Sequence, residues 1–205
     1  MLLPKQDLKE KLINKGVEVV KEKGIEKVSL RKIAEECGVT HSSPYRHFKN
    51  KNDYLVALVG KISNIFGKSI TRNIKKDMLP EEILLTMGIN FVNFSQNNPY
   101  FFSVLFLGDY IVPTRVDKDT LTSDKYLLGF ESVKEIVKLI SKKNGLQLSE
   151  DIEVVQLWSF IIGLSLIVGK QDVVNINDSW IRKVISQMIE VYILGNKERK
   201  NGHAR

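Results

Sequence analysis

The alternation of apolar and polar positions follows a helical period through nearly the whole chain. Strand signals are almost absent, since no Asn-Gly or Asp-Gly pair joins two alternating runs. The pattern predicts an all-α protein of about nine helices with one long loop at 108–122. The expected helices cover residues 5–23, 29–37, 40–48, 51–76, 80–96, 100–107, 123–143, 149–169 and 178–194.

Small and polar residues mark the expected ends of the first helices. Gly24 is placed to end the first helix, and Gly38 to provide a left-handed turn after the second. Ser29 and Thr40 are expected N-caps of the second and third helices. Asn50, with Asp53 three residues on, predicts a capping box at the start of the fourth.

Residues 28–55 carry the most specific pattern, VSLRKIAEECGVTHSSPYRHFKNKNDYL. Two short helices joined by a glycine turn, and then an aromatic and basic segment, are typical of a helix-turn-helix. Such a motif places its second helix in the major groove of DNA. The sequence therefore predicts a DNA-binding regulator.

Charge is unevenly distributed along the 205 residues, whose net charge is +7. Residues 1–52 hold twelve basic and seven acidic side chains, and residues 195–205 hold four basic and one acidic. The middle of the chain is close to neutral. This distribution fits a nucleic-acid-binding protein, and it fits a solvated lysine-rich surface equally well.

Other features predict a cytoplasmic protein without a cofactor. No apolar signal segment follows the N-terminus, and the longest apolar run, 157–168, is expected to be a buried helix too short to span a bilayer. The single cysteine, Cys37, suits a reducing compartment and is expected to be buried. The three histidines lack metal-ligand spacing, so no metal site is expected.

The run GIEKVSLRKIAEECGVT, followed by SPYRHFKNK, resembles the N-terminal domain of TetR/AcrR-type transcriptional regulators. The resemblance covers about residues 8–58, a quarter of the chain. It implies a three-helix DNA-binding domain at 1–50 and a helical ligand-binding and dimerisation domain at 51–196. The basic tail, 197–205, is expected to be disordered.

The DNA-binding candidates lie around the expected recognition helix. Thr40 would leave backbone N–H groups facing a phosphate, and Arg46 could read a guanine or touch only phosphate. From the resemblance, Tyr45 would pack its ring and contact a phosphate, and Lys51 would contact the backbone. Pro44, early in the helix, is expected to be tolerated. The full set is Ser29, Arg31, Thr40, His41, Ser42, Ser43, Tyr45, Arg46, His47, Lys49 and Lys51.

The candidates in the second domain rest on the resemblance and on apolar faces. Aromatic side chains are candidates to line a pocket for an apolar or amphipathic ligand, although such clusters are more often plain core. They are Phe91, Phe94, Phe101, Phe102, Phe106, Tyr126 and Trp158. The last two helices are expected to form a dimer interface, or else to be buried within one subunit. Its candidates are Leu157, Ile161, Leu164, Val168, Ile181, Ile185, Met188 and Tyr192.

The predicted function is a homodimeric repressor that binds a near-palindromic, double-stranded operator and is released by a small-molecule inducer. Ile162 stands where some relatives carry a histidine, so the role of that histidine does not transfer. A regulator that senses no ligand, and a non-specific nucleic-acid-binding or scaffold protein, are the alternatives. An enzyme is not expected, because none of the common phosphate-binding, metalloprotease or redox motifs is present.

Overall fold

The computed structural model describes residues 8–108, 114–117, 120–123, 128–146, 150–170 and 176–202. The chain divides into two compact units, one comprising 1–65 and 98–112 and the other 66–97 and 113–205. The division between the two compact units falls within a helix near residue 65. The segment 98–112 returns to the first unit, which no composition change along the sequence indicates.

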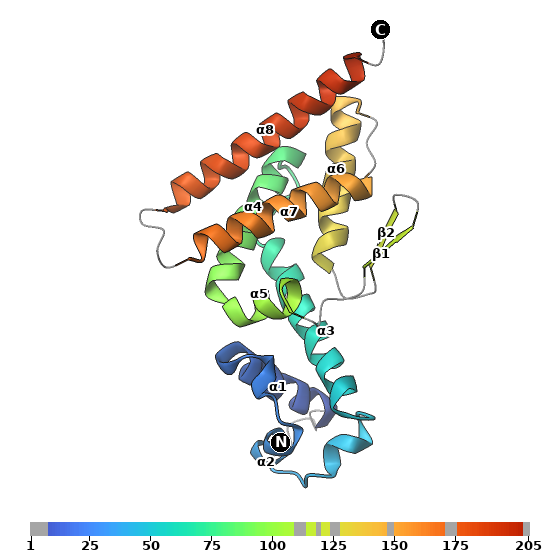
Figure 1. Ribbon diagram of the computed structural model, residues 1–205, viewed down its shortest axis with the longest axis vertical. Coiled ribbons are helices and arrows are strands. Elements are labelled where there is room, and N and C mark those ends of the chain that lie inside the picture. Colours follow the sequence, from blue (N-terminus) through green and yellow to red (C-terminus); the bar gives the residue numbers. More distant parts are fainter. Residues whose placement is uncertain are drawn as a thin grey trace. The chain divides into compact units, whose positions relative to one another are not determined.

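The first unit is built from short helices around one apolar core (Figure 1). Its elements are α1 (Leu8–Lys23), a 3-10 helix η1 (Ile25–Lys27), α2 (Leu30–Glu36), a second 3-10 helix η2 (Ser43–Arg46), the first part of α3 (Lys51–Ile70) and α5 (Pro99–Phe106). Leu12, Ile33, Phe48 and Leu58 are almost completely buried. Gly24 adopts φ +87°, a left-handed conformation that ends α1 as the sequence predicted.

The start of α3 confirms the expected cap. The Asp53 backbone N–H donates to Oδ1 of Asn50 at 2.9 Å, and Asp53 Oδ2 accepts from the Lys49 N–H at 2.9 Å. The first bond satisfies a donor that a helix leaves free at its first turn, and the second ties the Asp53 side chain to the residue before the cap. They fix where α3 begins, directly after the predicted recognition segment.

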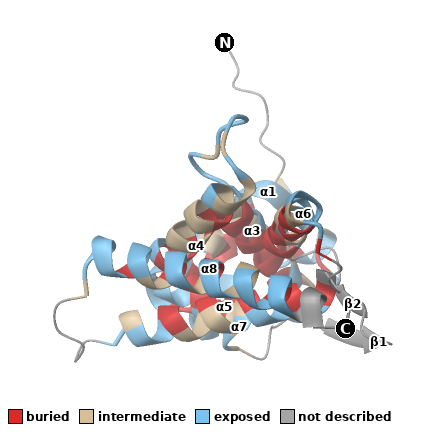
Figure 2. Ribbon diagram, turned by 90° about the horizontal axis from the view of Figure 1, so that it is seen from above, coloured by how far each residue is buried: buried red, intermediate tan, exposed pale blue. Residues whose placement is uncertain are grey.

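The second unit is a bundle of four helices: α4 (Pro80–Asn97), α6 (Leu128–Asn144), α7 (Glu150–Val168) and α8 (Asp178–Gly202). Its core contains rings packed edge to face, with Phe66 against Phe91 at 5.3 Å and Phe130 against Trp158 at 5.5 Å between centroids. Figure 2 shows exposed residues along the outer side of α8. Apolar burial on the inner faces is the main force that holds such a bundle together.

Several expected boundaries differ from the structure. Within the described residues there are eight α-helices, not nine, because the expected helix at 40–48 is replaced by η2. α3 ends at Ile70, where the Asn90 side chain donates to the carbonyls of Ile70 and Arg72. α8 runs to Gly202, so most of the tail expected to be disordered is helical.

A small hairpin occupies part of the segment that was expected to be a loop. Strands β1 (Thr114–Asp117) and β2 (Thr120–Ser123) pair antiparallel, with Thr114 opposite Ser123. Threonine and valine supply half of these positions, and β-branched residues favour strands. The pattern was missed because each strand has only four residues.

Helix α7 meets the length and composition of a membrane span over Asp151–Val168, a window that begins six residues before the apolar run at 157–168. The burial of its side chains shows better than length or composition how this helix packs. The helix contacts α4 and α6 and buries Val154, Leu157, Ile161 and Leu164. Core helices of soluble proteins have the same composition, and α7 packs as one of them.

Candidate DNA interface

The turn after α2 is held by a lysine from α1. Gly38 adopts φ +73°, as the sequence predicted, and the Lys11 ammonium donates to the Cys37 carbonyl at 2.9 Å. A positive charge at a helix C-terminus is favourable because the last carbonyls lack helical partners. Sequence analysis did not single out Lys11, since only the fold brings it to residue 37.

The expected recognition helix is a 3-10 helix of four residues, Ser43–Arg46, flanked by turns. Its N–H groups bond three residues back, from Ser43 to Thr40 and from Tyr45 to Ser42. Pro44 explains the difference: it has no N–H to donate, and it disfavours the α conformation in the residue before it. Pro44 was expected to be tolerated within an α-helix, so its effect is larger than the sequence analysis predicted.

The Thr40 side chain also behaves differently from the expected cap. Its hydroxyl lies 2.8 Å from the Ser43 hydroxyl and 3.2 Å from that of Ser42, and the helix has no side-chain cap. The three hydroxyls form a small exposed cluster before Arg46. They offer both donors and acceptors to a ligand on this side of the unit.

Most of the DNA-binding candidates are exposed, and all lie between residues 29 and 51 of the first unit. Exposed are Arg31, Thr40, His41, Ser42, Tyr45, Arg46, Lys49 and Lys51; half-buried are Ser29, Ser43 and His47. Tyr45 is 58% exposed, so its ring does not pack in the way the resemblance implied. Phe48 is buried as expected, and it anchors this segment to the core.

Behind the segment, Tyr54 connects α3 to α1. It is fully buried, and its hydroxyl donates to the Leu12 carbonyl at 2.7 Å. Its ring packs edge to face on Phe48 at 4.9 Å between centroids. Burial raises the pKa of Tyr54 well above the usual tyrosine value, so the hydroxyl remains a donor at physiological pH. Neither the buried position of Tyr54 nor this bond was predicted from the sequence.

Two carboxylates hold Lys15 of α1 close to α2. The Lys15 ammonium lies 3.1 Å from Glu18 and 3.2 Å from Glu36, and these hydrogen bonds raise the pKa of Lys15. The second pair crosses from α1 to the end of α2, directly before the turn. Burial raises the pKa of the nearby Cys37 thiol, although Lys11 and Lys15 oppose the shift, so the thiol remains protonated.

The ligand-binding candidates separate into different places. Phe91 and Trp158 line an almost wholly apolar cavity of about 40 Å³ in the second unit, together with Met87, Leu157 and Ile185. Phe94 instead packs on Phe66 at 5.1 Å. Phe101, Phe102 and Phe106 belong to α5 of the first unit, and Tyr126 lies outside the described residues. The aromatic residues therefore do not form one site.

Most of the dimer candidates are core residues of a single chain. The buried ones are Leu157, Ile161, Leu164, Ile181 and Ile185, while Val168, Met188 and Tyr192 are half-buried. The exposed apolar side chains of the same two helices are Ile152, Val155, Leu166, Ile167, Trp180, Val191 and Leu194. Burial within one subunit, the alternative to a dimer interface, therefore describes the predicted residues better. Other apolar residues of α7 and α8 remain exposed.

Within the described part of the chain, no three histidine, cysteine or acidic residues come together as metal ligands.

Comparison with known proteins agrees with this geometry. Residues 12–58 match the family model for bacterial regulatory proteins of the tetR family. The HTH-type transcriptional regulator PksA of Bacillus subtilis (strain 168) is 26% identical over 192 residues, covering 90% of each chain. The regulator YerO of the same organism is 29% identical over 57% of this chain, a match that spans only 43% of YerO.

Solved structures share the fold across both units. A TetR family protein from Vibrio parahaemolyticus superposes with a TM-score of 0.65 and 17% identity, covering 90% of this chain and 97% of that one. RolR in complex with resorcinol has a TM-score of 0.62 and 15% identity, covering 93% and 91%. Residues 12–58 thus match the DNA-binding domain of the tetR family, and the chain as a whole is similar to an HTH-type transcriptional regulator and shares the fold of TetR-family structures.

Proposed function

We propose that the protein is a homodimeric repressor that binds a near-palindromic operator and is released by a small apolar or amphipathic inducer. The carrying observation is the exposed set of hydroxyl, imidazole, guanidinium and ammonium groups between Thr40 and Lys51. Arg46 can donate two hydrogen bonds to a guanine, whereas Lys49 and Lys51 suit phosphates. A near-palindrome follows from two-fold symmetry, because each subunit of a dimer presents the same segment.

The dimer is supported by the exposed apolar face of α7 and α8. Val191 is 69% exposed, Leu194 53% and Ile167 50%. These are high values for large apolar side chains, and they occur on two consecutive helices. Large apolar side chains that remain exposed favour contact with another protein surface where they gather into a patch. In a two-fold dimer the same residues from both subunits would cover one another.

The inducer is supported by the cavity beside Phe91 and Trp158, and by the resorcinol complex of RolR. At about 40 Å³ the cavity is far smaller than the several hundred Å³ of a usual ligand pocket. An inducer would therefore bind a more open state, and would act if that state binds DNA less well. The small volume equally favours a regulator that senses no ligand.

The function is tested by selecting binding sites from a random duplex library with the purified protein. We expect an enriched near-palindrome, bound about a thousandfold or more tighter than a scrambled duplex at near-physiological salt. Tyr45→Ala with Lys51→Ala should abolish this preference. Lys75→Ala with Leu79→Ala removes one exposed lysine and one exposed large side chain from the second unit and should leave the preference intact.

Weak binding without enrichment would contradict a sequence-specific regulator and favour the non-specific alternative. An enriched site whose affinity no added small molecule changes would favour the ligand-independent regulator.

A further inference from the structure

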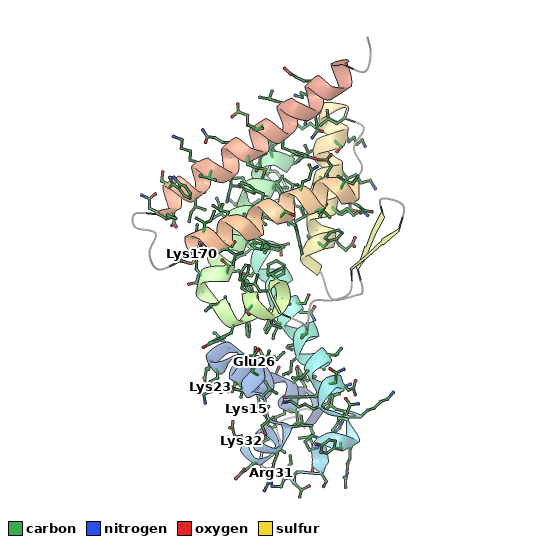
Figure 3. All side chains as sticks on the ribbon, viewed as in Figure 1. Lys15, Lys23, Glu26, Arg31, Lys32 and Lys170 are labelled. Carbon is green, nitrogen blue, oxygen red and sulfur yellow. The ribbon has the colours of Figure 1, made fainter. Side chains whose placement is uncertain are left out.

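A groove on the first unit shares only Ser29 with the candidate DNA interface described above. It lies between α1 and α2 and has a volume of about 250 Å³. We name it the α1–α2 groove. Its lining residues are Val19, Lys23, Lys27, Ser29, Lys32, Ile33 and Glu36. Figure 3 marks Lys23 on α1 and Lys32 on α2. Three of the seven lining residues are lysines, and only one carries a negative charge.

The single carboxylate of the groove is already engaged. Glu36 lies 3.2 Å from the ammonium of Lys15, and Lys15 is not one of the residues that line the groove. Among the described residues, no carboxylate lies within ion-pair distance of Lys23, Lys27 or Lys32. The groove therefore presents three ammonium groups without a protein counter-charge. Such an arrangement is repulsive unless an anion or solvent ions offset it.

Ser29 adds a hydrogen-bonding group at the same place. It precedes α2, where serine commonly caps the helix, yet its side chain makes no capping hydrogen bond. Its hydroxyl is therefore available to a ligand in the groove. Val19 and Ile33 supply the apolar part of the lining. Lysines around a hydroxyl suit the oxygens of a phosphate, which accept several hydrogen bonds at once.

We propose that the α1–α2 groove holds phosphates of the DNA backbone, in addition to those contacted by the recognition segment. The inference rests on the proposed DNA-binding function and extends its footprint to Lys23 and Lys32. DNA is favoured as the occupant because the groove is continuous with the candidate interface. Ser29 is both a DNA-binding candidate and a groove residue. Arg31, another DNA-binding candidate, lies between Ser29 and Lys32 in the sequence.

The role of the groove differs from base reading. Lysine is a flexible point charge and cannot make the planar paired contacts that identify a base. Neutralising phosphates adds affinity for every sequence and releases counterions, so it appears in the salt dependence of binding. The groove is therefore expected to hold the protein on DNA without selecting the operator.

The test compares wild type with Lys23→Gln, Lys27→Gln, Lys32→Gln on the selected operator and on a scrambled duplex. Binding is measured by anisotropy between 50 and 200 mM salt. The slope of log affinity against log salt should become shallower by about 0.9 for each phosphate that the variant no longer neutralises. Affinity should fall by the same factor on both duplexes, leaving their ratio unchanged. Thermal unfolding checks that the variant is folded.

A matched variant separates a local effect from the removal of three charges. Lys75→Gln, Lys76→Gln, Lys142→Gln makes the same charge change on exposed lysines of the second unit. It should leave the slope close to that of wild type. Phosphate-ethylation interference should show that the groove variant no longer needs particular phosphates that wild type needs.

An unchanged slope in the groove variant, or an equal change in both variants, overturns the inference while the DNA-binding function stands. Tight binding of inorganic phosphate by wild type, abolished in the groove variant without any change in the slope for DNA, also overturns it in favour of a free anion. Absence of operator preference in wild type instead contradicts the proposed function. The duplex ratio and the salt slope thus report the two proposals separately.

Discussion

At Gly16, one missing methyl group decides how closely α1 approaches α3. A Cβ built there would lie 2.1 Å from the Tyr54 hydroxyl oxygen and 2.7 Å from a Leu58 methyl carbon. The hydroxyl cannot retreat without losing its bond to the Leu12 carbonyl. Glycine costs a helix about 1 kcal/mol relative to alanine, so its presence in the middle of α1 reflects this close approach.

We predict that Gly16→Ala lowers the free energy of unfolding by about 1–3 kcal/mol, the usual cost of overpacking a core. Urea unfolding followed by circular dichroism measures the change. Gly195→Ala is the control, because nothing lies within 4 Å of a Cβ there and the helix is exposed. That variant should be neutral or up to about 1 kcal/mol more stable. A Gly16→Ala variant as stable as wild type would contradict the packing of α1 on α3.

The short recognition segment depends on the elements at its two ends. Before it, Lys11 fixes the turn after α2, and after it Asn50 and Asp53 fix the start of α3. The segment itself has only the hydrogen bonds of a 3-10 helix and the buried Phe48 to hold it. Its geometry is therefore set largely by its neighbours.

We predict that Asn50→Ala destabilises the protein by about 1 kcal/mol through loss of the cap. It should also weaken operator binding, because Lys49 and Lys51 flank the capped turn. Asn50→Ser retains a capping oxygen and should restore both properties. Unfolding curves and anisotropy on the same samples measure the two effects. Loss of stability with unchanged affinity would show that the cap does not position the interface.

Most helices, the two glycine turns and the Asn50 cap could be predicted from the sequence, because periodicity, glycine turns and capping residues are local signals. The expected caps at Ser29 and Thr40 make no capping hydrogen bond. The recognition helix could not be predicted, because Pro44 acts on the hydrogen bonds of a particular turn and the periodicity does not register it. The end of α3 at Ile70 also escaped prediction. It depends on the Asn90 side chain, twenty residues further along the chain.

In the assembled molecule, the faces of α7 were the hardest feature to predict. This helix has apolar residues on every side, so its pattern does not distinguish the buried face from the exposed one. The structure assigns Leu157, Ile161 and Leu164 to the core and leaves Leu166 and Ile167 exposed. The dimer prediction therefore moves to different residues of the same helices.

We predict that Val191→Glu converts the dimer to a monomer while the fold is retained. Val191 is 69% exposed in the single chain, so glutamate there costs little within the subunit but places a charge in the proposed apolar contact. Sedimentation equilibrium measures the mass, and circular dichroism checks the fold. Leu79→Glu, at an exposed leucine outside α7 and α8, should not change the mass. A dimer that persists in Val191→Glu would place the interface elsewhere.

The small cavity beside Phe91 and Trp158 has a consequence for how any ligand of that site would be measured. A molecule larger than about 40 Å³ can enter only after the helices around it have moved apart. Its apparent dissociation constant then equals the intrinsic one divided by the fraction of open molecules. A substitution that only makes opening easier would strengthen ligand binding without touching the ligand, so the most sensitive variants need not line the site.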